Sequence, residues 1–199
     1  SETRRVNFMR RLWVVGAVIW LVIAPSLATA VDPAGMIRSL ASQALEVLST
    51  SAPRDIERRA KLETLFRQSM DIDFVARFAA GRYWRQMSDQ EQQDYRDAFE
   101  QYVLRLYAGQ LNGYSGESFT VLGSREVDAN DTIVSSQLSR PNKAPVDIDW
   151  RVRMSGGEAK IIDVSIEGVS MALNQRQEFS SIMQREGVAG LIKRLRQPG

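Results

Sequence analysis

The chain of 199 residues contains neither cysteine nor histidine. Without cysteine it can form no disulfide, and it cannot carry the lipidated cysteine that follows a lipoprotein signal. Without histidine, the Ser-His-Asp and Cys-His catalytic systems and the Cys/His zinc sites are excluded as well. Acid–base chemistry would depend on Asp, Glu, Lys or Tyr, and no paired-carboxylate motif stands out. Carboxylate-only chemistry survives these absences, so from composition an enzyme is the weaker hypothesis, and we expect no cofactor.

Long apolar runs are also scarce, and the clearest one lies at the N-terminus. It extends over the twelve residues 12–23, follows four arginines and precedes the small residues 28–30, Ala-Thr-Ala. A basic region, a short apolar stretch and an A-x-A end are the three parts of a secretory signal peptide. The alternative is an uncleaved membrane anchor, but a spanning helix needs about 20 residues. We expect residues 1–30 to be a signal peptide cleaved near Ala30, and residues 31–199 to form one domain.

The chain has little excess of either charge. It carries 26 Lys and Arg residues against 24 Asp and Glu residues, for a net charge of +2. Residues 1–30 hold four of the arginines and one of the glutamates, so residues 31–199 have 22 basic and 23 acidic residues. A domain without a positive excess gives no indication of nucleic-acid binding.

The first half of this domain has the apolar period of helices. We expect four helices. The first extends over residues 32–51, and the second begins at residue 53 and has an apolar side that starts at Ile56. The third extends over residues 73–80 and ends at Gly81, and the fourth extends over residues 88–113. Asp32 followed by Pro33 is a typical helix start. Ser88 and Glu91 have the spacing of a capping box, which marks the start of the fourth helix.

The second half changes to the period of strands. Apolar and charged side chains alternate over residues 146–154, which is typical of a half-buried strand with one wet face. Further strands are expected over residues 118–126, 132–138 and 159–166, and their short connections favour an antiparallel meander. Two helices, over residues 170–186 and 188–195, close the chain on either side of Gly187. The order indicates an α+β fold, with helices packed on the concave face of a curved four-stranded antiparallel sheet.

Three segments of the domain carry a more specific pattern. Residues 78–85 read FAAGRYWR. The second segment runs from Phe99 through Tyr107 to Leu111 in the fourth helix and on to Tyr114 and Gly116. Residues 163–170 read DVSIEGVS, followed by Asn174, Arg176 and Phe179. In order and spacing, from about residue 31 to residue 195, they resemble the MlaC family of periplasmic phospholipid-binding proteins. This family is also called the toluene-tolerance auxiliary family.

The resemblance implies a soluble periplasmic carrier without catalytic residues or metal. Such a carrier moves phospholipid between an outer-membrane lipoprotein complex and an inner-membrane ABC transporter complex, and so maintains the lipid asymmetry of the outer membrane. It holds its ligand in an apolar cavity enclosed between the sheet and the helices. We expect a monomer with phospholipid as its ligand and no nucleic-acid partner. The alternatives are a role linked to hopanoid metabolism, or an assembly or interaction protein with the same fold and a closed core.

A lipid cavity requires an apolar lining, because each methylene exposed to water costs about 0.8 kcal/mol. The candidates come from the fourth helix, from the strands over residues 146–154 and 159–166, from the last long helix, and from two connections. On the second of these strands Ile162, Val164 and Ile166 are expected to share a face. They are Trp84, Phe99, Val103, Tyr107, Ile148, Trp150, Val152, Ile162, Val164, Val169, Met171 and Phe179. Any of them could instead belong to an ordinary filled core.

Three further positions have expected roles near this site. Trp84, at a helix end, either borders the cavity or caps the small core. Arg176 could reach a phosphate, although an exposed or paired helix arginine is the commoner case. Ser170 is expected to cap the last long helix.

Overall fold

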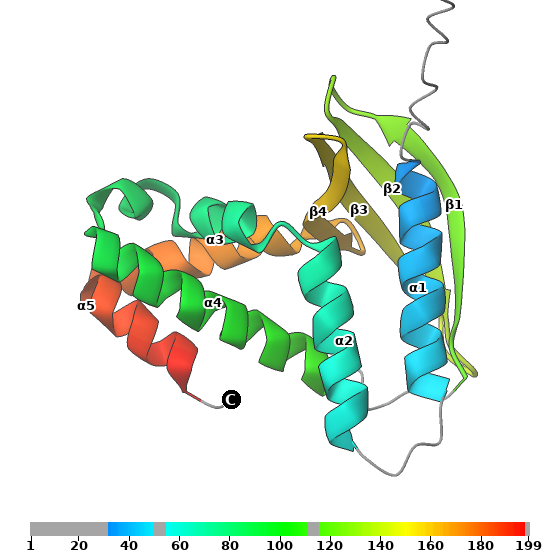
Figure 1. Cartoon of the computed structure of the whole chain (residues 1–199), viewed down its shortest axis with the longest axis horizontal. Coiled ribbons are helices and arrows are strands. Elements are labelled where there is room, and N and C mark those ends of the chain that lie inside the picture. The colour runs from blue at the N-terminus through cyan, green and yellow to red at the C-terminus, as the bar shows by residue number, and fades with distance from the viewer. Residues whose placement is uncertain (1–31, 50–54, 111–115, 198–199) are drawn as a thin grey trace, which may run out of the picture. The chain divides into compact units, whose positions relative to one another are not determined.

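The computed structural model of the protein describes residues 32–49, 55–110 and 116–197 (Figure 1). Residues 1–30, for which we expect a signal peptide, lie outside the described residues, as do Pro53 and Gly113. Residues 31–199 form one compact unit. Within the described ranges, no helix is both long and apolar enough to cross a membrane.

The helices follow the predicted order. They are α1 (Pro33–Ser49), α2 (Asp55–Ser69), α3 (Ile72–Ala80), α4 (Asp89–Gln110) and α5 (Met171–Arg196), and a 3-10 helix η1 (Gly81–Gln86) joins α3 to α4. The capping box before α4 is confirmed: the N–H of Ser88 donates to the Glu91 carboxylate at 2.8 Å, and the N–H of Glu91 donates to the Ser88 hydroxyl at 3.2 Å. The prediction for α2 is wrong at Ile56, which is 82% exposed. The apolar contacts of α2 with the core lie at its other end, where Phe66 packs.

The predicted break in the last helical region is confirmed within α5. Gly187 has φ 72° and ψ −179°, which are not helical, so α5 consists of two segments that meet at a kink. Arg194 donates two hydrogen bonds across the kink to the Glu186 carboxylate, at 2.8 and 2.6 Å. Ser170 caps the start of α5, as expected, because its hydroxyl accepts from the N–H of Leu173 at 3.0 Å.

The strands form one open antiparallel sheet in chain order. They are β1 (Ser118–Glu126), β2 (Asp131–Ser139), β3 (Val146–Ser155), β4 (Glu158–Ile166) and β5 (Val169–Ser170). The four predicted strands are confirmed, with ends within one residue of those expected. The sequence does not predict β5, because two residues are too few to show a period. The edge of β4 is also bridged at Ile161, whose carbonyl accepts from the N–H of Asp71 at 2.9 Å.

A register shift between β3 and β4 alters the apolar face of the sheet. Val152 pairs with Ile161 and Arg151 pairs with Asp163, so Ile162 is the extra residue of a β-bulge. Ile161, rather than Ile162, packs with Val164 in the sheet's hydrophobic cluster. The expected face of Ile162, Val164 and Ile166 is therefore corrected, because strict alternation cannot continue through a bulge.

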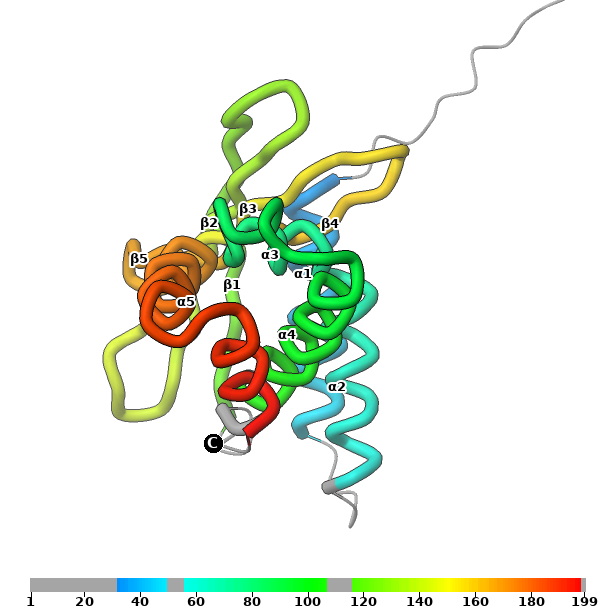
Figure 2. Tube along the Cα trace, turned by 90° about the vertical axis from the view of Figure 1, so that its left-hand side faces the viewer, coloured from blue at the N-terminus to red at the C-terminus, as the bar shows by residue number. Residues whose placement is uncertain are grey.

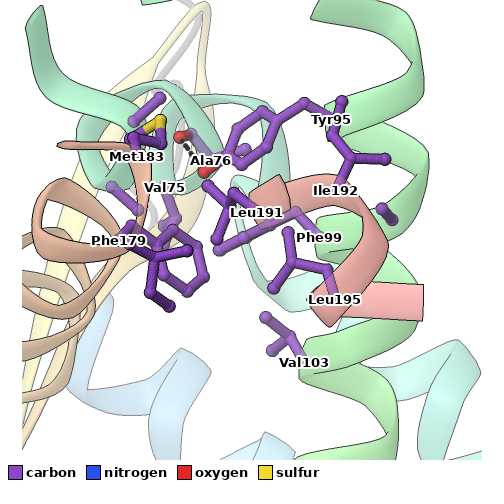
Figure 3. Close-up of a cluster of buried hydrophobic side chains, with 14 of the residues drawn as sticks. Val75, Ala76, Tyr95, Phe99, Val103, Phe179, Met183, Leu191, Ile192 and Leu195 are labelled. Atoms are coloured by element: carbon purple, nitrogen blue, oxygen red, sulfur yellow. Dashed lines mark hydrogen bonds between the residues drawn. The ribbon is translucent and has the colours of Figure 1, made fainter. Parts of the chain in front are cut away.

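Buried apolar side chains gather in two clusters. The helical cluster comprises Val75, Ala76, Ala79, Ala80, Met87, Tyr95, Ala98, Phe99, Val103, Ala172, Phe179, Ile182, Met183, Leu191, Ile192 and Leu195 (Figure 3). The sheet cluster comprises Ala34, Ile37, Val134, Val152, Ile161 and Val164. In Figure 1, α1 lies along the sheet, whereas α3, α4 and α5 lie beside one another. The core is thus divided between a sheet covered by α1 and a layer of helices.

A buried carboxylate ties β2 to β3. The side chain of Asp131 is fully buried, and it accepts hydrogen bonds from Arg153 at 2.6 and 2.8 Å and from Arg151 at 2.8 Å. The Arg153 guanidinium also lies 4.5 Å from the centre of the Phe74 ring in α3. Hydrogen bonds from Arg153 and then Arg151 hold the pKa of Asp131 below its ordinary value of 3.8, although burial acts in the opposite direction.

Gly81 lets α5 approach the end of α3. It has φ 57°, and its N–H donates to the carbonyls of Arg77 and Phe78. A Cβ at this position would lie 3.1 Å from Nε of Arg176, whose guanidinium lies 5.0 Å from the centre of the Phe78 ring. Arg176 therefore packs against the end of α3 in the space that a side chain at position 81 would occupy.

We predict that Asp131→Asn lowers the free energy of unfolding at neutral pH by about 1–3 kcal/mol, because it removes the ionised partner of two arginines. The folded-state pKa of Asp131 is depressed, so the carboxylate stabilises the fold above its ordinary pKa. This stabilisation is lost as the pH falls through the folded-state value. The variant should therefore lose less stability on acidification. Urea unfolding at neutral and acid pH measures both effects, and Asp149→Asn is the control; equal losses in the two variants would contradict the prediction.

We also predict that Gly81→Ala destabilises the fold by about 1–3 kcal/mol, because alanine is strained at this backbone conformation. Thermal unfolding with a fixed probe measures the loss. Gly123→Ala is the matched control, since Gly123 does not have a positive φ and no atom lies within 4 Å of its added Cβ. A Gly81→Ala variant as stable as this control would contradict the requirement for glycine at this backbone conformation.

Candidate functional site

The boundary between the sheet cluster and the helical cluster is the candidate site. The helix α2 contacts α1, α4 and β4, and so connects the two parts of the core. Met70, which follows α2, packs against both clusters. Figure 2 shows α4 and α5 in front of the sheet when the molecule is viewed from the side of the helices. The two clusters are thus apolar surfaces on opposite sides of one boundary.

The sheet side of this boundary carries apolar groups that are only half-buried. Ile148 and Trp150 pack at the border of the sheet cluster, and the ring of Phe119 lies edge-on to Trp150 with 6.2 Å between centroids. The indole N–H of Trp150 donates to the Ser136 hydroxyl at 2.9 Å, and this hydroxyl donates to the carbonyl of Ile148 at 2.9 Å. These polar groups are satisfied within the sheet, so the face stays apolar.

Aromatic rings dominate the other side. Phe99 and Phe179 lie perpendicular to each other with 6.1 Å between centroids, and Val103 follows Phe99 one turn along α4 (Figure 3). Tyr102 is half-buried, and its hydroxyl donates to Gln175 at 3.4 Å. Burial raises the pKa of Tyr102, so the phenol stays neutral. Three of the predicted residues, Phe99, Val103 and Phe179, therefore belong to the helical cluster.

Four of the predicted residues belong to the sheet side. Val152 and Val164 are members of the sheet cluster, and Ile148 and Trp150 pack against it. The structure thus divides these seven predicted residues between the two surfaces, and the sequence alone does not predict which residue belongs to which surface.

Trp84 lies at the outer end of the helical cluster. Its ring packs edge-on against Tyr95, and the guanidiniums of Arg77 and Arg96 lie 5.4 and 5.3 Å from its centre. The element that carries it, η1, contacts α3 and α5. Of the two roles considered for Trp84, this position fits the cap of the small core.

The remaining predicted residues lie apart from these groups or have side chains that the structure does not describe. Val169 is 54% exposed in β5, and Met171 is half-buried at the start of α5. Ile162 is buried at the bulge of β4. The side chain of Tyr107, near the end of α4, lies outside the described residues.

Asp163 fixes the position of α5, a role that the sequence pattern alone did not reveal. Its Oδ1 accepts from the N–H groups of Val164 and Ala172 at 2.8 and 3.0 Å, and its Oδ2 accepts from the Ser170 hydroxyl at 2.5 Å. The segment DVSIEGVS is therefore a strand-to-helix joint. It sets the direction in which α5 presents Phe179 to the helical cluster.

The described part of the chain has two surface pockets with polar groups in their lining. One, of about 480 Å³, lies between α2, α3, α4 and the β3–β4 turn; Met70 is in its lining, together with charged residues that include Arg67, Glu100 and Lys160. The other, of about 460 Å³, lies between α1 and α2 and has a mixed polar and apolar lining. Among the described side chains, no group of three or more Asp or Glu residues is placed to hold a metal ion.

Comparisons with known proteins agree with this fold. A family model described as MlaC protein matches residues 38–197. Toluene tolerance protein ttg2D from Pseudomonas putida is 24% identical over 106 residues, which cover 53% of this chain but only 49% of that protein. The intermembrane phospholipid transport system binding protein MlaC from Haemophilus influenzae is 23% identical over 144 residues, covering 68% of this chain and 67% of that protein.

A solved structure extends the comparison to three dimensions. The phospholipid-binding protein from Ralstonia solanacearum, in complex with a phospholipid, matches with a TM-score of 0.74 and 24% identity. The match covers 82% of this chain and 94% of that one, and it supports the α+β fold. Since the family model spans most of the domain, from α1 to the end of α5, this chain belongs to the MlaC family.

Proposed function

We propose that this protein binds a phospholipid with its acyl chains between the sheet cluster and the helical cluster. The observation that carries the proposal is the division of the apolar residues into two surfaces in a chain of the MlaC family. Half-buried Ile148 and Trp150 on one side, and Tyr102 on the other, offer apolar area that the protein itself does not fully cover. An acyl chain would cover it.

The energetics of lipid transfer require such a site. Exposing two acyl chains of ordinary length to water costs roughly 20 kcal/mol at about 0.8 kcal/mol per methylene. A carrier must remove most of that surface from water, whereas the head group can stay in solvent. The satisfied indole of Trp150 and the neutral phenol of Tyr102 suit an acyl chain, because neither presents a charge to it.

The proposed lining follows from the two surfaces. Ile148, Trp150, Val152 and Val164 contribute from the sheet, and Phe99, Val103 and Phe179 contribute from the helices. For Tyr107, Ile162, Val169 and Met171, contact with lipid stays a prediction from the sequence, and of the two roles expected for Trp84 we propose the cap of the small core. The lining offers no nucleophile or acid–base pair, which fits binding rather than catalysis.

The transport role extends this proposal to the cell. We infer that residues 1–30 direct export and are removed near Ala30, so that residues 31–199 act as a monomeric carrier in the periplasm. The carrier would receive and deliver phospholipid at an outer-membrane lipoprotein complex and an inner-membrane ABC transporter complex. The name of the Haemophilus relative, an intermembrane phospholipid transport system binding protein, supports a role in transport.

The first test is the lipid content of the protein. Protein secreted into a bacterial periplasm and purified without detergent should carry phospholipid in stoichiometric amount, because free acyl chains would not remain in water. Native mass spectrometry reports the mass of the bound lipid and the number of subunits together. A protein of bare polypeptide mass, with no lipid in its organic extract, would remove the basis of the proposal.

The second test fills the proposed site. Ile148→Trp adds volume to a half-buried position on the sheet side, so it should lower the bound lipid several-fold with little change in thermal stability. The control is Ile56→Trp, which makes the same exchange in α2 at a position that is 82% exposed. An Ile148→Trp protein that folds and carries as much lipid as the control would contradict the placement of the acyl chains, and would favour a closed core.

A further inference from the structure

The segment FAAGRYWR carries a surface that lipid binding in the core does not use. Over residues 74–88 the chain has three arginines and no acidic residue, although residues 31–199 as a whole are almost neutral. The segment comprises most of α3 together with η1, which lies at the end of the helical layer away from the sheet (Figure 1). Charge is therefore concentrated at one end of a domain that has almost no net charge.

Four arginines meet at this end, and we name them the arginine face: Arg77, Arg82, Arg85 and Arg176. Arg176 comes from α5 and joins the others because its Nε lies 3.1 Å from the Cβ position of Gly81. Arg77, Arg82 and Arg176 are stacked on Trp84, Tyr83 and Phe78, at 5.4, 5.0 and 5.0 Å from the ring centres. All four side chains are exposed.

The arginine face has no carboxylate partners of its own. Among the residues that the structure describes, none of its four guanidiniums takes part in an ion pair. The neighbouring acids have other partners: Asp73 pairs with Arg96, Glu91 accepts from Ser88, and Glu178 accepts from Gln175. The positive charge is thus left to the solvent.

Stacking on aromatic rings prepares these guanidiniums to bind anions. A stacked guanidinium is held in place, keeps its N–H groups free at its edge and loses little side-chain entropy on binding. Planar guanidiniums match the geometry of phosphate oxygens. The rings are covered by the arginines, so the face offers charge and hydrogen bonds rather than an apolar wedge.

We propose that the arginine face docks the protein, weakly and reversibly, on the surface of a membrane that contains anionic phospholipid. Exposed arginines near such a surface gain electrostatic energy that adds from residue to residue. The proposal extends the carrier function, but it rests on a surface separate from the proposed lipid site.

Vesicle binding tests the proposal. The secreted protein, with its processing checked by intact mass, should sediment with vesicles of phosphatidylethanolamine and phosphatidylglycerol, and salt should weaken this binding. It should not sediment with vesicles of phosphatidylcholine alone. The variant Arg82→Gln/Arg85→Gln should bind the anionic vesicles about 30-fold more weakly, because it removes two of the four charges.

A matched control distinguishes an effect of the arginine face from an effect of the protein's net charge. Arg125→Gln/Lys143→Gln removes the same charge from exposed positions in β1 and in the β2–β3 loop, so it should bind like the unmodified protein. Thermal unfolding should be unchanged in both variants, since Arg85 makes no described contact and Arg82 touches only Tyr83. Equal weakening in the two variants would overturn the assignment of docking to this face.

Lipid content keeps this test distinct from that of the carrier function. If the protein carries phospholipid but does not bind anionic vesicles, membrane docking is wrong, and an acidic protein surface becomes the partner to seek. If it binds the vesicles through the arginine face but carries no lipid, docking stands and the carrier function fails. The Arg82→Gln/Arg85→Gln variant should carry as much lipid as the unmodified protein.

Discussion

The sheet presents an apolar face that α1 covers only in part, and most of the architecture depends on what covers the rest of that face. The helical layer does not close over it to make one core. Instead, α3, α4 and α5 bury their own aromatic cluster, and this cluster is connected to the sheet by Met70 and by contacts of α2, α3 and α5 with β4. Trp150 and Ile148 are left half-buried at the boundary. An apolar surface of this kind is stable in water only when it is small or when a ligand covers it.

Three groups of contacts outside the two clusters hold the helices and strands in position. Asp163 and Ser170 fix the start of α5, Gly81 allows Arg176 to pack on the end of α3, and Asp131 ties β2 to β3. Each group consists of hydrogen bonds or close packing near the end of a helix or strand. These contacts set the positions of α5 and of the strands relative to the elements beside them.

The sequence predicts the elements well wherever a period or a cap is local. The alternation of β3 and the capping box of Ser88 and Glu91 could be read directly, because the partners are neighbours in the chain. The bulge at Ile162 and the exposure of Ile56 could not, since both depend on what packs against the element from elsewhere. β5 and η1 are too short to show a pattern.

The candidate site was predictable as a set of residue types but not as an arrangement. A side chain that faces a filled core and one that faces a ligand follow the same apolar period, so Phe179 and Trp150 look alike in sequence. Only the structure assigns one to the helical cluster and the other to the border of the sheet cluster. The same holds for FAAGRYWR, whose aromatic residues turn inward while its arginines stay at the surface.

Tryptophan fluorescence can test the placement of the acyl chains most directly. The chain has four tryptophans, and once residues 1–30 are removed only Trp84 and Trp150 remain. Phospholipid with brominated acyl chains quenches an indole that it touches. After loading with this lipid, a Trp84→Phe protein should lose most of the emission of Trp150, whereas a Trp150→Phe protein should keep that of Trp84. Unquenched Trp150 in a protein that demonstrably holds the brominated lipid would contradict a site between the two clusters.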